Sequence, residues 1–314
     1  MKPHDTIYVA GHRGLVGSAV VDELHAQGFT NLIVRTRAEL DLTDPHAVEA
    51  FFAAERPAYV FLCAAKVGGI WANANQKADF LRDNIYITTN ILTAAQRYGA
   101  AKVLNLGSTC IYPKEAPQPL REESLMTGPL EPTNDAYALA KIAGIYYGRA
   151  LRTQYGLPVI SAQPTNVYGP RDNFHPDHAH VIPGMMARMH AAKLRGDATF
   201  PIWGSGRPLR EFIYAHDLAR ALVLLMQRYD GEMHINVGTE AEISIADLAA
   251  LMQRVVGFAG QLVFDPSKPD GTLRKVTDSS RLKALGWQPQ MPLEEGLRAM
   301  YAWYVDNPDT VRAR

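Results

Sequence analysis

The sequence predicts an α/β protein built on a doubly wound parallel sheet, joined to a smaller α/β lobe toward the C-terminus. Short runs rich in β-branched and aromatic residues alternate with helical patterns through the first half of the chain. These runs are continuously apolar, as strands covered on both faces should be. After residue 166 the composition changes, because Gly, Pro and charged residues cluster at 168–184 and 203–212. The change indicates that a second lobe begins there.

The order of the elements follows from the periodicity of apolar residues and from the turn residues between them. Strands are expected at residues 6–11, 31–36, 59–65, 102–108, 159–169 and 234–238. Helices are expected at residues 16–28, 44–57, 84–99, 137–156, 217–229 and 244–257. The second helix has the clearest start, since Asp44 can act as its N-cap and Pro45 fits its first turn.

Charge and composition exclude several classes of protein. The chain has 314 residues, with 32 basic and 32 acidic side chains, so a general nucleic-acid or anionic-membrane surface is not expected. No run approaches the roughly 20 apolar residues of a membrane helix. The N-terminal stretch MKPHDTIYVAG enters a strand without a signal-peptide core. Cys63 and Cys110 are the only cysteines, which fits a reducing compartment, and we expect a cytoplasmic protein.

The stretch AGHRGLVGSA places Gly11, Gly14 and Gly17 between the first strand and the first helix. Glycines there allow the backbone to approach a pyrophosphate, which a helix N-terminus also favours. A tight turn with close helix packing would need the same glycines. Their position in an alternating α/β chain favours a dinucleotide site of the Rossmann type.

The end of the second strand indicates which dinucleotide is bound. Enzymes that use NAD place a carboxylate there for the ribose hydroxyls. This chain has Arg35 and Arg37 instead, with Arg13 inside the glycine loop, and guanidinium groups match a 2′-phosphate in charge and shape. Asp41 and Leu42 are expected near the adenine. The sequence therefore predicts NADP(H), although one or more of these arginines could simply face solvent.

The stretch YALAK places Tyr137 and Lys141 four residues apart, on one face of a helix. Tyrosine can give a proton to an alkoxide as hydride reaches the carbon, and a nearby ammonium would lower its pKa from about 10. Ser108, at the end of a strand, can donate to the same oxygen. Together the three residues predict a reductase or dehydrogenase site.

With these motifs the sequence resembles the extended short-chain dehydrogenase/reductases, and within them the GDP-4-keto-6-deoxy-D-mannose 3,5-epimerase-4-reductases. The resemblance extends over nearly the whole chain, from residue 10 to about residue 275. It is carried by the stretches AGHRGLVGSA, RTRAELDL, AAKVGGI, LGSTCIYPK, EPTNDAYALAKIAGI, PTNVYGPRDNFHP, HVIP, WGSGRPLREF, HINVG and SKPDGTLRK.

The resemblance implies roles for further residues. Cys110 would be the epimerisation base and His180 its acid partner, acting beside Ser108, Tyr137 and Lys141. It also implies cofactor contacts from Lys141, Pro164, Asn166 and His180. Substrate contacts would come from Ser108, Cys110, Asn166, Arg188, Trp203, Arg210 and Asp270.

Other interpretations of these residues stay open. Cys110 could be a small buried hydrophobe, and Cys63, inside an apolar strand, is interpreted as core. His180 stands near His175 and His178, a spacing that could suggest zinc, but no cysteine lies close by. We expect no metal, and a solvated loop explains His178. Arg188, Trp203 and Asp270 could equally be a surface arginine, a core tryptophan and a turn residue.

The resemblance completes the expected organisation. Residues 1–165 would form the NADP-binding domain, with a return excursion around 213–238, while 166–212 and 239–314 would bind the GDP-sugar. The expected activity is C3 and C5 epimerisation followed by C4 reduction to GDP-L-fucose, in a homodimer joined through the Tyr137 helix and the helix before it. One alternative is a C4-reductase of a GDP-6-deoxy-4-keto-heptose. Another is a non-catalytic NADP(H)-binding scaffold or redox sensor.

Overall fold

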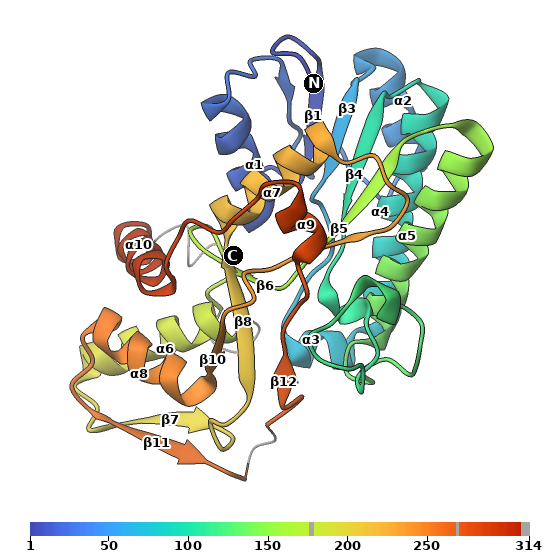
Figure 1. Ribbon diagram of the computed structural model, residues 1–314. Coiled ribbons are helices and arrows are strands. Elements are labelled where there is room, and N and C mark those ends of the chain that lie inside the picture. The colour runs from blue at the N-terminus through green and yellow to red at the C-terminus, as the bar shows by residue number, and fades with distance from the viewer. Residues whose placement is uncertain (176–178, 268–269, 309–314) are drawn as a thin grey trace.

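The computed structural model describes residues 1–175, 179–267 and 270–308. Its centre is a six-stranded parallel sheet, in the order β2-β1-β3-β4-β5-β9 (Figure 1). The strands are β1 (Ile7–Ala10), β2 (Leu32–Ile33), β3 (Tyr59–Leu62), β4 (Lys102–Leu106), β5 (Val159–Pro164) and β9 (Ile235–Val237). This confirms the predicted doubly wound sheet.

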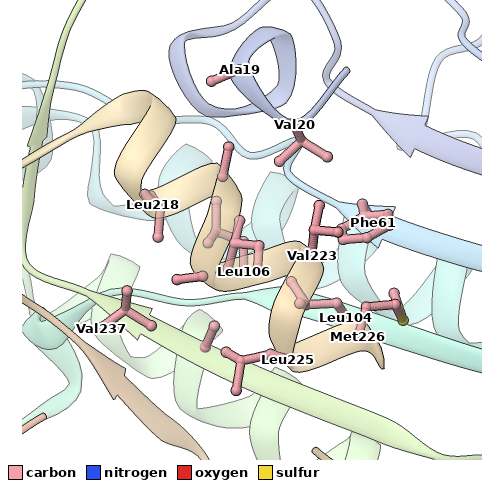
Figure 2. Packing of buried hydrophobic residues seen from close by; sticks show 14 of the residues in the cluster. Ala19, Val20, Phe61, Leu104, Leu106, Leu218, Val223, Leu225, Met226 and Val237 are labelled. Carbon is pink, nitrogen blue, oxygen red and sulfur yellow. The ribbon is translucent and has the colours of Figure 1, made fainter. Parts of the chain in front are cut away.

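Helices cover both faces of this sheet, and alternate residues of each strand face different helices. In β3, Phe61 joins the core beneath α1 and α7, whereas Val60 and Leu62 join the core beneath α2 and α4. Figure 2 shows Leu218 and Val223 of α7 reaching into the first of these cores. Each such buried side chain contributes about 1.5–3 kcal/mol. The helices are α1 (Leu15–Ala26), α2 (Pro45–Glu55), α4 (Lys77–Arg97), α5 (Asp135–Tyr155) and α7 (Ala215–Arg228).

The start of α2 confirms the predicted capping. The Asp44 carboxylate accepts hydrogen bonds from the backbone N–H groups of His46, at 2.8 Å, and Ala47, at 3.3 Å. Pro45 occupies the first helical position, where it has no N–H group to leave unpaired. Local sequence alone therefore determines where this helix begins.

A second group of elements packs around its own apolar core, which includes Met186, Phe212, Leu248 and Met252. Strand β8 pairs with β6 and β12 in parallel and with β10 antiparallel, while β7 pairs with β11 (Figure 1). The strands are β6 (Asn166–Tyr168), β7 (Thr199–Trp203), β8 (Leu209–Tyr214), β10 (Glu242–Ser244), β11 (Gln261–Asp265) and β12 (Arg274–Lys275). The helices are α6 (Val181–Arg195), α8 (Ile245–Val256) and α10 (Leu293–Asp306).

The predicted strand at 159–169 was wrong as a single element. It divides into β5 and β6, which belong to different sheets. Pro164 has no N–H group to donate, and at Thr165 the backbone N–H still donates to Val237 while the side chain donates to the Glu211 carbonyl of β8. The chain therefore changes partner strand at this point.

Several elements of the second group escaped prediction: the helices α6 and α10 and the strands β7, β8, β10, β11 and β12. Four short elements, whose few residues carry no periodicity, were also missed. They are α3 (Ile70–Asn75), η1 (Thr109–Ile111), η2 (Glu122–Ser124) and α9 (Ser280–Ala284). Strand β2 is also shorter than predicted, at two residues. Among the described residues, no helix is long and apolar enough to cross a membrane.

Candidate active site

The loops after β1, β3, β4 and β5 all leave the same edge of the sheet, because these strands are parallel. Ligands of doubly wound sheets bind at this carboxyl edge. Gly11 follows β1, Cys63 follows β3 and Ser108 follows β4, so the topology brings three predicted regions together. The candidate site is built on this edge.

The glycine loop fits a pyrophosphate. A Cβ atom on Gly17 would lie 2.2 Å from the Gly11 carbonyl oxygen, and one on Gly11 would lie 2.8 Å from the Ala64 nitrogen. Glycine is therefore required for α1 to pack against the loop. Gly14 is the N-cap of α1, and no side chain caps the N–H groups of the first turn. Those donors are the groups that would hold a bound diphosphate.

The three arginines predicted to bind a 2′-phosphate differ in their surroundings. Arg35 is paired with Glu55 at 2.5 Å and lies over the Phe51 ring, so its guanidinium already has a structural partner. The Arg37 side chain is 85% exposed, and the ion pair between its guanidinium and the Asp41 carboxylate is long, at 4.0 Å. Arg13 is also exposed, inside the glycine loop. By exposure alone, Arg37 and Arg13 are the two of these three arginines that solvent reaches most readily.

The two residues expected near the adenine have defined local roles. The Asp41 carboxylate accepts hydrogen bonds from the Thr43 backbone at 2.9 Å and from the Thr43 hydroxyl at 2.8 Å, and these lower its pKa. The Leu42 carbonyl accepts a bond from Asn90 of α4. Both residues are half-buried in the loop before α2.

Tyr137 and Lys141 lie on one face of α5, with the ammonium 5.6 Å from the centre of the phenol ring. The Lys141 side chain is buried, and its Nζ donates to the Leu106 carbonyl at 2.8 Å. Burial lowers the pKa of Lys141 to about 8 and raises that of Tyr137. The expectation of a lowered tyrosine pKa is therefore wrong for this arrangement, because burial raises it and Cys110 adds to the rise.

The stretch Ser108–Cys110 forms a tight turn beside this pair. Ser108 caps the short helix η1, and its hydroxyl accepts a bond from the Cys110 backbone at 3.3 Å. The Ser108 backbone N–H donates to the Gln163 side chain of β5 at 2.8 Å. A Cβ on Gly107 would lie 1.9 Å from that side-chain oxygen, so a larger residue before the serine would displace the Gln163 side chain. Sequence reasoning gave Gln163 no role.

Cys110 is buried, and burial raises the pKa of its thiol. Lys275, the Ser108 hydroxyl and Lys141 oppose this shift, with Lys275 the most effective. Two lysines therefore place positive charge near the thiol. Nothing in the local sequence around Cys110 indicates Lys275, because β12 is far away along the chain.

His180 is the N-cap of α6 and its side chain caps no backbone group. It is accessible to solvent, yet surrounding protein lowers its pKa and the charge of Lys275 lowers it further. His180 therefore lies within electrostatic range of the same lysine that faces Cys110. Its neighbour His178 lies outside the described residues.

The remaining residues predicted to bind the substrate lie on the helices, strands and loops of the second group of elements. The Arg188 guanidinium lies over the Trp203 ring, 5.0 Å from its centre, and Trp203 is largely exposed. The Asp270 carboxylate accepts bonds from the Ser205 backbone at 2.6 Å and hydroxyl at 2.7 Å. Arg210 is half-buried within electrostatic range of Asp270. These groups can hold a planar base and an anionic ligand.

Asn166 and Pro164 mark the change from β5 to β6. The Asn166 amide donates to the Glu211 carbonyl at 2.8 Å, which ties this corner to β8. Pro164 ends β5 and is buried. Both residues lie where the central sheet meets the second group of elements.

Two further interpretations concern the second cysteine, expected in the core, and the histidines whose spacing could suggest zinc. Cys63 follows β3 and packs against the core as expected, and burial raises the pKa of its thiol to about 12. It also lies within electrostatic range of Lys141. Among the described residues, no group of three or more His, Cys, Asp or Glu side chains is placed to hold a metal ion.

Comparison with known proteins identifies close relatives. The chain is 57% identical over 302 residues to the probable GDP-L-fucose synthase 1 of Oryza sativa subsp. japonica, covering 96% of this chain and 92% of that protein. Among solved structures, it is similar to a GDP-6-OMe-4-keto-L-xylo-heptose reductase from C. jejuni, with a TM-score of 0.92 and 35% identity, covering 98% and 99% of the two chains.

A second solved structure is a GDP-L-fucose synthetase from Naegleria fowleri bound to NADP. Its TM-score is 0.91 at 33% identity, and the match covers 99% of this chain and 97% of that one. The family model described as NAD dependent epimerase/dehydratase family matches residues 7–238, from the start of β1 to just past the end of β9. The chain therefore belongs to the NAD dependent epimerase/dehydratase family.

Proposed function

We propose that this protein is an NADPH-dependent epimerase-reductase that converts GDP-4-keto-6-deoxy-D-mannose to GDP-L-fucose. The observation that carries the proposal is the position of Cys110 beside the Tyr137–Lys141 pair, within electrostatic range of both. A plain reductase needs only Ser108, Tyr137 and Lys141. A thiol among them adds a group that can remove a proton from carbon. The names of the rice and Naegleria relatives agree with this activity.

Reduction at C4 follows from the protonation states of the site. Burial raises the pKa of Tyr137, so the phenol is protonated at neutral pH and can donate to the oxygen at C4. Ser108 can donate to the same oxygen. Lys141 holds a positive charge near both groups. NADPH, when bound, supplies the hydride.

Epimerisation uses the same oxygen. The C4 ketone acidifies the protons at C3 and C5, and the Cys110 thiolate can take one of them. The electron pair of the broken C–H bond then forms an enolate, whose oxygen lies at the donors Ser108 and Tyr137. His180 can return a proton from the opposite face, which inverts the carbon. Tyr137 protonates this oxygen only later, when hydride reaches C4.

The cofactor is NADP(H), which the glycine loop and the accessible charges of Arg13 and Arg37 support. We propose that Lys141, Pro164, Asn166 and His180 also contact it. The GDP-sugar would lie against Arg188, Trp203, Arg210 and Asp270, close to Ser108, Cys110 and Asn166. The division into residues 1–165 with 213–238 for the cofactor, and 166–212 with 239–314 for the sugar, is part of this proposal.

Incubation with GDP-4-keto-6-deoxy-D-mannose and NADPH in D2O tests the activity. Deuterium at both C3 and C5 of a reduced, inverted product is expected by mass spectrometry and NMR. Reduction without solvent deuterium would contradict the epimerase half. The Cys110→Ser variant is the matched control, since it should bind NADPH but lose the exchange at C3 and C5.

A GDP-6-deoxy-4-keto-heptose is the second candidate substrate, because the C. jejuni structure of 35% identity is that of a heptose reductase. The side chains proposed above for reduction and epimerisation act at C3, C4 and C5, so one extra carbon on the sugar does not change their roles. Comparing kcat/KM for the two GDP-sugars decides between them. Oxidation of NADPH with either sugar would exclude the alternative of a non-catalytic NADP(H)-binding scaffold.

We further propose a homodimer joined through α4 and α5. Tyr86 of α4 and Leu139 and Tyr146 of α5 are large apolar side chains that stay exposed in the single chain. A Tyr146→Glu variant should be monomeric by light scattering. Leu194→Glu, at an exposed leucine of α6, is the matched control and should stay dimeric.

A further inference from the structure

Lys275 reaches the site through strand pairing between distant parts of the chain. It is the second residue of β12 and lies opposite Arg210 in the parallel pairing of β12 with β8. The next residue, Val276, donates its backbone N–H to Gln118 at 3.0 Å and accepts from Leu120 at 2.8 Å. Gln118 and Leu120 lie in the loop that follows Cys110. The backbone of Lys275 is therefore tied to the loop that carries Cys110.

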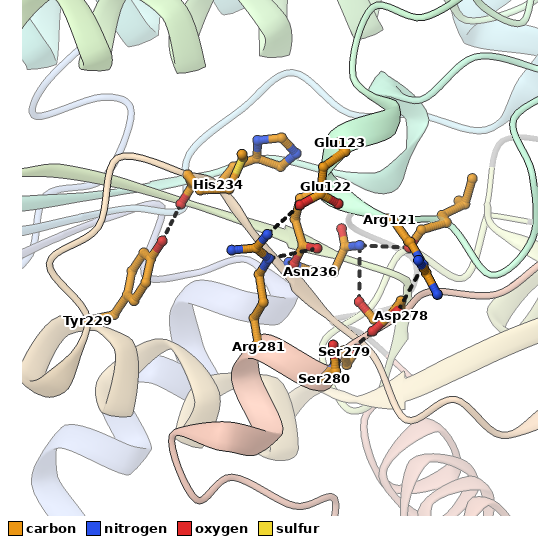
Figure 3. Close-up of polar contacts among 12 residues, drawn as sticks. Arg121, Glu122, Glu123, Tyr229, His234, Asn236, Asp278, Ser279, Ser280 and Arg281 are labelled. Atoms are coloured by element: carbon orange, nitrogen blue, oxygen red, sulfur yellow. Dashed lines mark hydrogen bonds and ion pairs between the residues drawn. The ribbon is translucent and has the colours of Figure 1, made fainter.

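A buried polar cluster holds this segment in place. Figure 3 shows Asn236 of β9 between the two stretches, where its amide donates to the Leu120 carbonyl at 2.9 Å and to the Asp278 carbonyl at 3.2 Å. Arg281 adds an ion pair to the buried Glu122 at 3.4 Å. These contacts hold the backbone of the segment after Lys275, so the position of the Lys275 Cα atom is well defined.

The Lys275 ammonium makes no hydrogen bond or ion pair to another described residue. The charged and titratable groups that face it are Cys110 of η1, Arg210 and Glu211 of β8, and Glu131 before α5. Lys275 in turn acts on His180 at the N-cap of α6. Burial lowers the pKa of Lys275, and both carboxylates oppose this shift, though less than Cys110 does. Both carboxylates also have other partners. Glu131 is paired with Lys114 at 3.2 Å, and Glu211 accepts bonds from the backbone of Glu240 and from Thr277.

We propose that Lys275 is a positioning residue for epimerisation, whose charge sets the pH range over which Cys110 acts as a base and His180 as an acid. This inference rests on the proposed function. It adds a group that the reductase half of the reaction does not need. Lys275 touches no reacting atom in this role and acts only through the two side chains.

The sign of the effect is the same for both groups. A positive charge favours loss of a proton from any neighbour, so Lys275 lowers the pKa of Cys110 and also that of His180. Burial opposes the charge at Cys110, where Lys141 and the Ser108 hydroxyl act in the same direction as Lys275. Removing the Lys275 charge should therefore move both limbs of a bell-shaped pH profile toward higher pH.

Alkylation of Cys110 tests the inference without any sugar. The rate of iodoacetamide labelling is followed against pH by peptide mass spectrometry in the full chain. In Lys275→Met and Lys275→Gln, the midpoint for Cys110 should rise by roughly one pH unit. Lys275→Arg should restore it, because it keeps the charge. Cys63 in the same samples is an internal reference that should not change.

Lys283→Met is the matched control, because Lys283 belongs to the same C-terminal segment but is exposed and paired with Glu240. An unchanged Cys110 midpoint in the Lys275→Met and Lys275→Gln variants would overturn the inference. So would an equal shift in Lys283→Met. Since labelling needs no substrate, this result holds even if the GDP-sugar assignment fails.

Solvent exchange at C3 and C5 gives the second readout. In Lys275→Met the pH profile of deuterium incorporation should move as a whole to higher pH by a similar amount. A lysine with a merely structural role would lower the rate without moving the profile. A raised KM with an unmoved profile would make Lys275 a ligand of the substrate phosphates only, and would also contradict the inference.

Discussion

At the scale of single residues, burial acts on Tyr137 and Lys141 in opposite directions for one reason. Loss of water disfavours the charged form of each, so the pKa of the phenol rises and that of the ammonium falls to about 8. The phenol therefore keeps its proton at neutral pH. That is the form needed by a group that protonates an oxygen during reduction.

Replacing Tyr137 by Phe removes this proton and little else, since the ring still packs against Phe80 at 6.4 Å between centres. Reduction at C4 should fall by about 10²–10⁴-fold. NADPH consumption followed by absorbance measures the loss, and cofactor fluorescence checks that binding is intact. Turnover at the normal rate would remove Tyr137 from the mechanism.

The cofactor preference also depends on single side chains. Arg37→Ser should weaken NADPH binding about ten- to hundredfold and leave NADH binding unchanged, because only NADPH has a 2′-phosphate for an exposed guanidinium to bind. Titration calorimetry with both cofactors measures the ratio. Arg97→Ser, at an exposed arginine on the last turn of α4, is the matched control. A ratio equal to that of the control would place the phosphate elsewhere, with Arg13 next to be tested.

At the scale of elements, the contact between β1 and α1 depends on two glycines used in different ways. Gly17 is needed inside the fold, because the helix touches the Gly11 carbonyl at its position. Gly14 is exposed at the N-cap, where a Cβ would lie 3.4 Å from that carbonyl, an ordinary contact. Gly17 is therefore required for packing, while Gly14 leaves room for a ligand.

The two alanine variants should separate these roles. Gly17→Ala should lower the free energy of unfolding by about 1–3 kcal/mol, because the helix must move away from the loop. Gly14→Ala should change it by a few tenths of a kcal/mol, yet weaken NADPH binding. Urea denaturation and calorimetry measure the two quantities. Equal effects of both variants on stability would contradict this division.

At the scale of the whole molecule, the polar cluster of Figure 3 joins three distant stretches: the loop after Cys110, strand β9 and the residues after β12. His234 is buried at its edge. Its Nδ1 accepts from Arg149 at 3.3 Å, so its Nε2 carries the proton and donates to the Tyr112 hydroxyl at 3.0 Å. Tyr112 in turn donates to Asn236 at 2.5 Å.

This histidine makes stability depend on pH. Burial, with help from Arg149, lowers the pKa of His234 from 6.5 to about 4. Between pH 6.5 and pH 4, His234 is protonated in the unfolded chain but not in the folded chain. The free energy of unfolding therefore falls as pH falls, by at most about 3 kcal/mol. His234→Gln cannot titrate and should flatten this dependence, measured as unfolding free energy between pH 6.5 and pH 4. The exposed His46→Gln should keep the wild-type slope, and an unchanged slope in His234→Gln would assign the dependence to other groups.

The sequence by itself determined what depends on local pattern. Strand and helix periods identified the doubly wound sheet, Asp44 and Pro45 marked a helix start, and the spacing of Tyr137 and Lys141 put them on one face of α5. The tertiary structure decided what depends on distance in space. Pairing of β12 with β8 placed Lys275 within electrostatic range of Cys110, and burial reversed the expected shift of Tyr137. Charge and desolvation act through space, so neighbours along the chain do not reveal them.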